Sequence, residues 1–187
     1  MTRQLTPLSL RGSLGFTQRL TRIFFPIAVS QAAQGPGWAV DPSQVGGAAC
    51  WVDAANGMVP PGAVPAGMDS EQLYVGRARH EGAFLPGKVV PSHGVCYVPW
   101  GGAEHGKQEY QVLCGCQPVW MPAQGGKIPA DALPAGETED GEPLFVGRAV
   151  HNGVAAVGKV QASHNCCYVP YGGQELPFSE YEVLVAK

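Results

Sequence analysis

Short apolar runs that alternate with polar residues and end at glycine or proline make up most of the chain after residue 72. Residues 72–80, 87–90, 96–98 and 109–113 are rich in β-branched and aromatic side chains, which predicts four strands joined by tight turns. No long apolar repeat with a period of about 3.6 residues occurs outside the N-terminal region. The pattern therefore predicts an all-β protein.

The same pattern occurs twice in the chain. Residues 73–113 align without a gap to residues 144–184, with roughly 23 of 41 positions identical. Strands are accordingly expected at 143–151, 158–161, 167–169 and 180–185. Because so small a β-unit has exposed edges and little core, we expect the two copies to pack on each other as a pseudo-twofold pair and to exchange strands.

Matched residues within the copies suggest how each copy is built. Trp51 and Trp120 open the two copies and precede turn-rich sequence at 53–57 and 122–126. Large aromatic side chains at matched positions are typical of core anchors, and a platform on which a ligand stacks is the alternative. Gly76 and Gly147 interrupt the expected strands, which indicates a bulge or a close approach of another backbone.

The charge balance excludes one class of function. The first 40 residues contain four arginines and no acidic residue, so the remainder carries 8 basic against 15 acidic residues. A nucleic-acid-binding protein would need a clustered basic face on its folded part. We therefore expect no nucleic-acid partner.

The six cysteines do not form a repeated framework, because only Cys96 and Cys167 are equivalent between the copies. Buried or free thiols are therefore expected rather than disulfide bonds. The pairs His93 with Cys96 and His164 with Cys167 suggest zinc, but residues three apart on a strand face opposite sides of the sheet. We expect no metal and no cofactor.

The first 37 residues differ in composition from the rest and form an N-terminal extension with a Gly35-Pro36-Gly37 linker. Arginines without acids resemble a mitochondrial presequence, whereas residues 23–29 followed by small residues resemble a secretory signal. A retained tail that docks on a partner is the third interpretation, and it would leave the protein cytoplasmic. The apolar run is too short to span a membrane.

Lys88 and Lys159 are the lysines at equivalent positions, each after a glycine at the start of an expected strand. A lone lysine is commonly a solvated surface charge. Carboxylates precede the neighbouring strand in both copies, however, and Asp69 could approach Lys88 if the two strands pair. A carboxylate that accepts and an ammonium that donates suit the paired hydroxyls of a sugar.

The chain resembles the DM9 repeat family over about 140 residues, through motifs that recur in both copies. In the first copy these motifs are Trp51, Ala66-Gly67, Tyr74-Val75-Gly76-Arg77-Ala78, Gly87-Lys88, Tyr97-Val98-Pro99, Gly101-Gly102 and Tyr110. The resemblance implies a tandem DM9 protein with a β-prism-like fold and dimerisation. Characterised members include mannose-binding lectins that act in pattern recognition in innate immunity.

The resemblance also implies which residues contact the sugar. An Asp in the turn and the Lys after Pro-Gly bind mannose in those lectins, and they correspond here to Asp69 and Lys88. In the second copy Thr138 stands opposite Asp69, Asp140 is the nearest carboxylate, and Lys159 is the equivalent lysine. The second copy therefore departs from the family's pattern.

Two further expectations concern charge and catalysis. Arg77 and Arg148 recur with Glu104, Glu175, Glu109 and Glu180, which suggests ion pairs that fix strand ends. No nucleophile motif frames the Ser, His, Asp and Cys residues, so the protein is not expected to be an enzyme.

Taken together, the sequence predicts an extension (residues 1–37), a first DM9-like repeat (38–116) and a second (117–187). The expected function is recognition of mannose-type glycans by a carbohydrate-binding module. The alternative is a structural or scaffold subunit, a homodimer or larger assembly, that keeps the DM9 fold without binding sugar.

Overall fold

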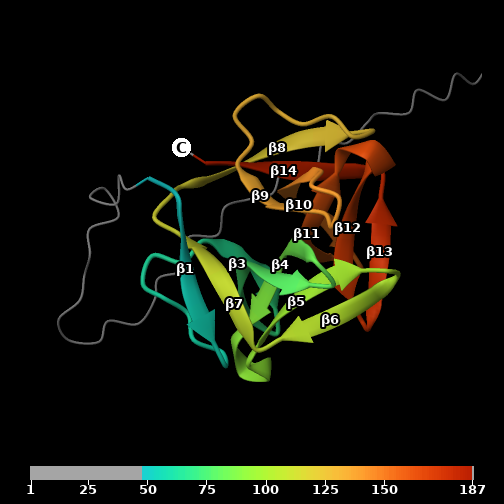
Figure 1. The fold of residues 1–187 in the computed structure, drawn as a ribbon. Coiled ribbons are helices and arrows are strands. Elements are labelled where there is room, and N and C mark those ends of the chain that lie inside the picture. The colour runs from blue at the N-terminus through green and yellow to red at the C-terminus, as the bar shows by residue number, and fades with distance from the viewer. Residues whose placement is uncertain (1–47, 187) are drawn as a thin grey trace, which may run out of the picture. The chain divides into compact units, whose positions relative to one another are not determined.

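The computed structural model describes residues 48–186, and these residues form strands connected by short turns (Figure 1). The all-β fold class is therefore confirmed. The predicted extension 1–37 lies outside the described residues, and the boundary between 116 and 117 stays a prediction. The strands are β1 (Cys50–Ala55), β2 (Pro65–Asp69), β3 (Glu71–His80), β4 (Ala83–Val90), β5 (Val95–Trp100), β6 (Ala103–Lys107), β7 (Glu109–Cys114), β8 (Pro118–Gln124), β9 (Pro134–Glu137), β10 (Pro143–His151), β11 (Val154–Gln161), β12 (Cys166–Tyr171), β13 (Gln174–Phe178) and β14 (Glu180–Ala186).

All of these strands belong to one sheet, whose order is β1-β7-β3-β4-β5-β6-β13-β12-β11-β10-β14-β8. Strand β9 pairs with both β10 and β4, where Glu137 is the register partner of Phe84. The path from β4 through β5, β6, β13, β12, β11 and β10 to β9 therefore returns to β4. Eight strands close into a barrel, which removes their free edges.

Strands from both halves of the sequence build this barrel together. At the junction of β6 with β13, Ala103 is the register partner of Gln174. When strands are matched through the sequence repeat, the order of the sheet is the same from either end. The core of one half is therefore continuous with that of the other, and Figure 1 shows the green strands of the first half beside the red strands of the second.

Most predicted strands are present, and the differences have a local cause. Strands β3 and β10 match their predicted ranges closely, and β4 begins four residues earlier than predicted, at Ala83. The turn expected at 53–57 is confined to residues 56 and 57, because β1 continues to Ala55 along β7. Strands β6 and β13 were not predicted. Their sequences contain few β-branched residues, so pairing with β5 and β12 specifies them rather than local propensity.

The glycines inside β3 and β10 mark close approaches, but the nearest atoms belong to side chains and not to the backbone that the sequence predicted. A Cβ added to Gly76 would lie 2.6 Å from Val89 Cγ2, and one added to Gly147 would lie 2.4 Å from Val160 Cγ2. Trp51 and Trp120 pack against one cluster of buried side chains, which agrees with their predicted role in the core. Each also stacks on an arginine, at 4.2 Å for Arg77 and 4.3 Å for Arg148.

Candidate functional site

Lys88 and Lys159 are buried, which contradicts the interpretation that they are solvated surface charges. Each is 5% exposed, and within residues 48–186 they are the only buried residues that carry a formal charge. The preceding glycine explains the position. A Cβ on Gly87 would lie 2.0 Å from the Tyr97 carbonyl oxygen, and one on Gly158 would lie 1.9 Å from that of Tyr168. Only glycine lets the next strand approach so closely.

The first cavity has a volume of about 320 Å³ and contains both residues predicted for the first sugar site. Strand β3 pairs with β4, as the prediction required, and β2 lies on the other side of β3. Ser70 turns the chain with a φ of 57°, so that Asp69 ends β2 at the cavity. The lining residues are Asp69, Ser70, Leu73, Lys88, Val90, His93, Tyr97, Glu104, Tyr171 and Gly172.

The ammonium of Lys88 has few partners for a buried charge. Glu104 Oε1 is 3.6 Å from Lys88 Nζ, beyond the usual range of an N–H···O hydrogen bond. The Tyr171 ring centroid is 4.8 Å away. Burial lowers the pKa of Lys88, and the negative charges of Glu104 and Asp69 oppose that shift. The ammonium therefore has donors available to a ligand in the cavity.

The second cavity, of about 480 Å³, is built from the equivalent elements of the second half. It contains Lys159, Thr138 and Asp140, so the structure also brings together the residues predicted for the second site. Its lysine is more fully bonded, because Lys159 Nζ donates to the Pro99 carbonyl oxygen at 2.9 Å and lies 3.0 Å from Glu175 Oε1.

Thr138 is occupied within its own turn. Its Oγ1 accepts a hydrogen bond of 3.0 Å from the backbone N–H of Glu142. The Glu142 carboxylate in turn accepts bonds from Ser163 and Gln161. Burial alone would raise the pKa of Glu142, but the bonds from Ser163 and Gln161 outweigh it and the pKa is lowered. This carboxylate is therefore a fixed negative charge at the second cavity.

Two glutamates, one after each Gly-Gly turn, link the two halves through hydrogen bonds. Glu104 Oε2 accepts from the backbone N–H of Gly173 at 2.7 Å, and Glu175 Oε2 accepts from that of Gly102 at 2.7 Å. Each glutamate thus faces the lysine of its own half and is held by the turn of the other. Each cavity is also completed by an aromatic residue of the other half, Tyr171 for the first and Trp100 for the second.

The predicted ion pairs of Arg77 and Arg148 with these glutamates are wrong. Glu104 and Glu175 contact the buried lysines instead, since the lysines have the greater need for a counter-charge. Arg148 Nε pairs with Glu182 at 2.5 Å. Arg77 Nε donates to the amide oxygen of Gln111 at 2.9 Å.

Sequence reasoning missed the glutamates and aromatic rings as cavity residues. The recurrence of Gly-Gly-x-Glu after Tyr-Val-Pro in both copies was the available signal. It did not reveal that the segment crosses from one cavity to the other, because that follows from the pairing of β6 with β13.

All six cysteines are free, in agreement with the prediction from their spacing. Within residues 48–186, no group of three or more His, Cys, Asp and Glu side chains is arranged to hold a metal ion. A search of the same described residues finds no helix with the length and apolar character needed to cross a membrane.

Comparison with known proteins finds similarity of sequence to one protein and similarity of fold to another. The chain is 27% identical over 135 residues to Natterin-4 of Thalassophryne nattereri, which covers 69% of this chain and 32% of that protein. The fold resembles the nematode sperm cell motility protein MFP2B, with a TM-score of 0.59 and 18% identity over 84% of this chain and 50% of that structure. The chain thus spans about a third of Natterin-4 and half of MFP2B.

The family comparison covers both cavities. The DM9 repeat matches residues 68–178, a range that runs from the residue before Asp69 to the end of β13. It contains Lys88, Lys159 and both glutamates that face them. The match extends over more than half of the chain, and the protein therefore belongs to the DM9 repeat family.

Proposed function

We propose that the protein is a carbohydrate-binding module for mannose-type glycans, without enzymatic activity, and that the first cavity is its principal site. The observation that carries this proposal is the buried ammonium of Lys88, which shares a small cavity with the Asp69 carboxylate and lies 3.6 Å from its ion-pair partner Glu104. A sugar hydroxyl accepts from an ammonium and donates to a carboxylate, so two neighbouring hydroxyls match this pair.

The remaining walls of the first cavity also suit a sugar. Tyr97 and Tyr171 supply aromatic surface for the apolar C–H face of a pyranose ring. His93 Nδ1 lies 3.1 Å from the Tyr97 hydroxyl, which holds that ring in place. A volume of about 320 Å³ favours one terminal sugar unit over a long buried chain.

We further propose that the chain is a tandem of two DM9 units, with a weaker second sugar site at Lys159, Thr138 and Asp140. The matching order of strands from either end of the sheet supports this organisation. The site is expected to be weaker because Lys159 already donates to Pro99 and Thr138 already accepts from Glu142.

Calorimetric titration with methyl α-mannoside tests the proposal. Wild type should bind, whereas Asp69→Asn and Lys88→Met should each lose at least tenfold in affinity, because one of two paired hydroxyl contacts is removed. Lys127→Met, an exposed lysine away from both cavities, is the matched control and should bind as wild type does.

Thermal unfolding of each variant shows whether the fold is intact. Absence of binding by wild type, or equal binding by folded Asp69→Asn and Lys88→Met, would contradict the proposal. The scaffold alternative would then stand, and it predicts a stoichiometric complex in native extract that free mannose does not release.

A further inference from the structure

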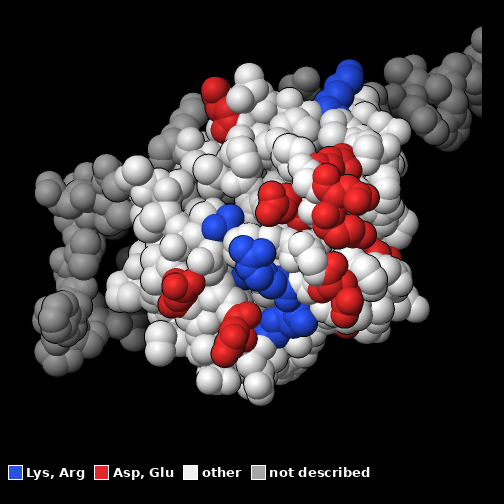
Figure 2. All heavy atoms as spheres, viewed as in Figure 1, with Lys and Arg blue, Asp and Glu red and all other residues white. Residues whose placement is uncertain are grey.

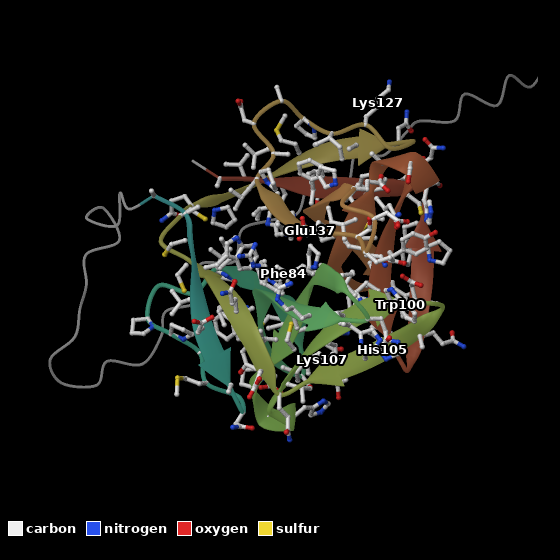
Figure 3. All side chains as sticks on the ribbon, in the orientation of Figure 1. Phe84, Trp100, His105, Lys107, Lys127 and Glu137 are labelled. Carbon is white, nitrogen blue, oxygen red and sulfur yellow. The ribbon has the colours of Figure 1, made fainter. Side chains whose placement is uncertain are left out.

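A group of cations lies outside both sugar cavities, on strands β3 and β6 of the first half. Its members are Arg77, Arg79 and Lys107, called here the cation cluster. Within residues 48–186, none of the three forms an ion pair with a carboxylate. Figure 2 shows lysine and arginine atoms gathered in a stripe, and Figure 3 places Lys107 and Phe84 in that region, with Lys127 well apart.

Aromatic stacking holds the two arginines in place. Arg77 Cζ lies 4.2 Å from the Trp51 ring centroid and 4.3 Å from that of Phe84. Arg79 Cζ lies 4.7 Å from the same Phe84 ring. Burial, and then the charge of Arg79, lower the pKa of Arg77 to about 10. Two like charges are therefore kept close together, and Arg79 is exposed to solvent.

The second half shows that the fold does not require this cluster. Val150, Ala155 and Phe178 occupy the positions of Arg79, Phe84 and Lys107, although β10 and β11 pair in the same register as β3 and β4. The partner of the matched arginine also differs between the two halves. Glu182 forms an ion pair with Arg148, whereas Gln111 stands at the equivalent position and leaves Arg77 without an ion pair.

The cluster borders an open cavity of about 660 Å³, larger than either proposed sugar cavity. Arg79 and Lys107 line it together with Phe84 and Tyr110. The equivalent cavity of the second half, about 590 Å³, contains Lys127 but no arginine. Arg79 and Lys107 form no ion pair within residues 48–186, and the planar guanidinium fork of Arg79 matches the geometry of an oxyanion.

The surroundings limit the size of such a ligand. Asp53 and Glu109 also line the cavity, and the Asp53 carboxylate accepts a hydrogen bond of 2.8 Å from Gln111. Figure 2 shows further acidic atoms on both sides of the basic stripe. Flanking negative charge would repel a long polyanion, whereas a short ligand can place its single anionic group between Arg79 and Lys107.

We propose that this cavity binds a small oxyanionic ligand, whose carboxylate, sulfate or phosphate group pairs with Arg79 and Lys107. The site is separate from the mannose cavities and does not depend on their function. It gives a role to the two cations that line this cavity without forming an ion pair, at positions where the second half has Val150 and Phe178.

Titration in a buffer free of phosphate and sulfate tests the site, with glucose 6-phosphate, glucuronate and neutral glucose as probes. The two anionic probes should bind to wild type, and glucose should not. Arg79→Gln and Lys107→Gln should each weaken binding at least fivefold, and the double variant at least twentyfold. Raising the salt concentration from 50 to 300 mM should weaken binding several-fold.

Three controls separate binding at this cavity from binding elsewhere and from loss of the fold. Lys127→Gln removes one positive charge at the equivalent cavity of the second half and should bind the anions as wild type does. Lys88→Met should also retain anion binding, so failure of the sugar proposal leaves this test intact. Arg79→Gln should unfold at the same temperature as wild type or higher, because it relieves repulsion with Arg77.

Several results would overturn the proposal. These are no anion binding by wild type, unchanged binding by a folded Arg79→Gln, or equal binding of glucose and glucose 6-phosphate. Tighter binding of a single-stranded oligonucleotide of twenty nucleotides than of glucose 6-phosphate would overturn the limit on ligand size.

Discussion

The first and second cavities share one framework but use their buried lysine differently. Lys159 donates to the Pro99 carbonyl at 2.9 Å and lies 3.0 Å from Glu175, whereas the carboxylate oxygen paired with Lys88 is 3.6 Å away. In the second cavity the Lys159 ammonium is taken up by contacts that link the two halves. In the first cavity the Lys88 ammonium still has donors available for a ligand. An ionic group whose donors are satisfied within the protein has less to offer a ligand, even when the cavity around it is larger.

The largest effect on stability is expected from replacing the glycine that precedes the buried lysine in both cavities. Gly87→Ala and Gly158→Ala would place a Cβ 2.0 Å and 1.9 Å from a carbonyl oxygen, so each should destabilise the fold by about 3 kcal/mol. Urea unfolding measures the loss. Gly106→Ala, whose Cβ would meet nothing closer than 3.3 Å, is the control. A cost confined to one of the two glycines would show that the frameworks differ.

Removing the charge of the glutamate should lower the free energy of unfolding more at the second cavity than at the first. Glu175→Gln keeps an acceptor for Gly102 but removes the charge 3.0 Å from Lys159, and should cost about 2 kcal/mol. Glu104→Gln should cost about 1 kcal/mol, because its lysine is 3.6 Å away. Free energies of unfolding from urea titration compare the two. The reverse order would contradict the idea that the second lysine is the more structural one.

Replacing the buried lysine should weaken sugar binding more at the first cavity than at the second. Lys88→Met should weaken binding of methyl α-mannoside at least tenfold, which is about 1.4 kcal/mol, while Lys159→Met should weaken the tighter site less than threefold. Calorimetry fitted to two sites separates the effects. Equal losses in both variants would mean that the lysine already bonded to Pro99 is as available as Lys88.

The smallest effect concerns acid stability at the second cavity. The pKa of Glu142 is lowered in the folded state from 4.5, so its contribution is fully present above 4.5 and is lost as pH falls through the folded value. Glu142→Gln should therefore show a smaller loss of stability than wild type between pH 5 and pH 3. Unfolding midpoints across this range measure it, and parallel curves would show that the carboxylate contributes nothing.

The class of fold and much of the strand plan could be predicted from the amino-acid sequence. Alternating apolar residues and glycine punctuation located β3, β7, β10 and β14, because each strand has one face in the core and its neighbours fix the register. The equivalence of Lys88 and Lys159 also came from the repeat. Their burial did not, since a lysine is normally exposed and the cause is a glycine that admits the backbone of β5 or β12.

How the halves meet, and which charges pair, depends on contacts between distant parts of the chain. Strands β6 and β13 have weak propensity and exist because β5 and β12 offer them partners. Their pairing brings Glu104 to the turn of the other half at Gly173, an acceptor–donor contact between residues 69 positions apart. The sequence pattern suggested an arginine as the partner of that glutamate, because opposite charges can be matched in many ways until the buried cation with the greatest desolvation cost is known.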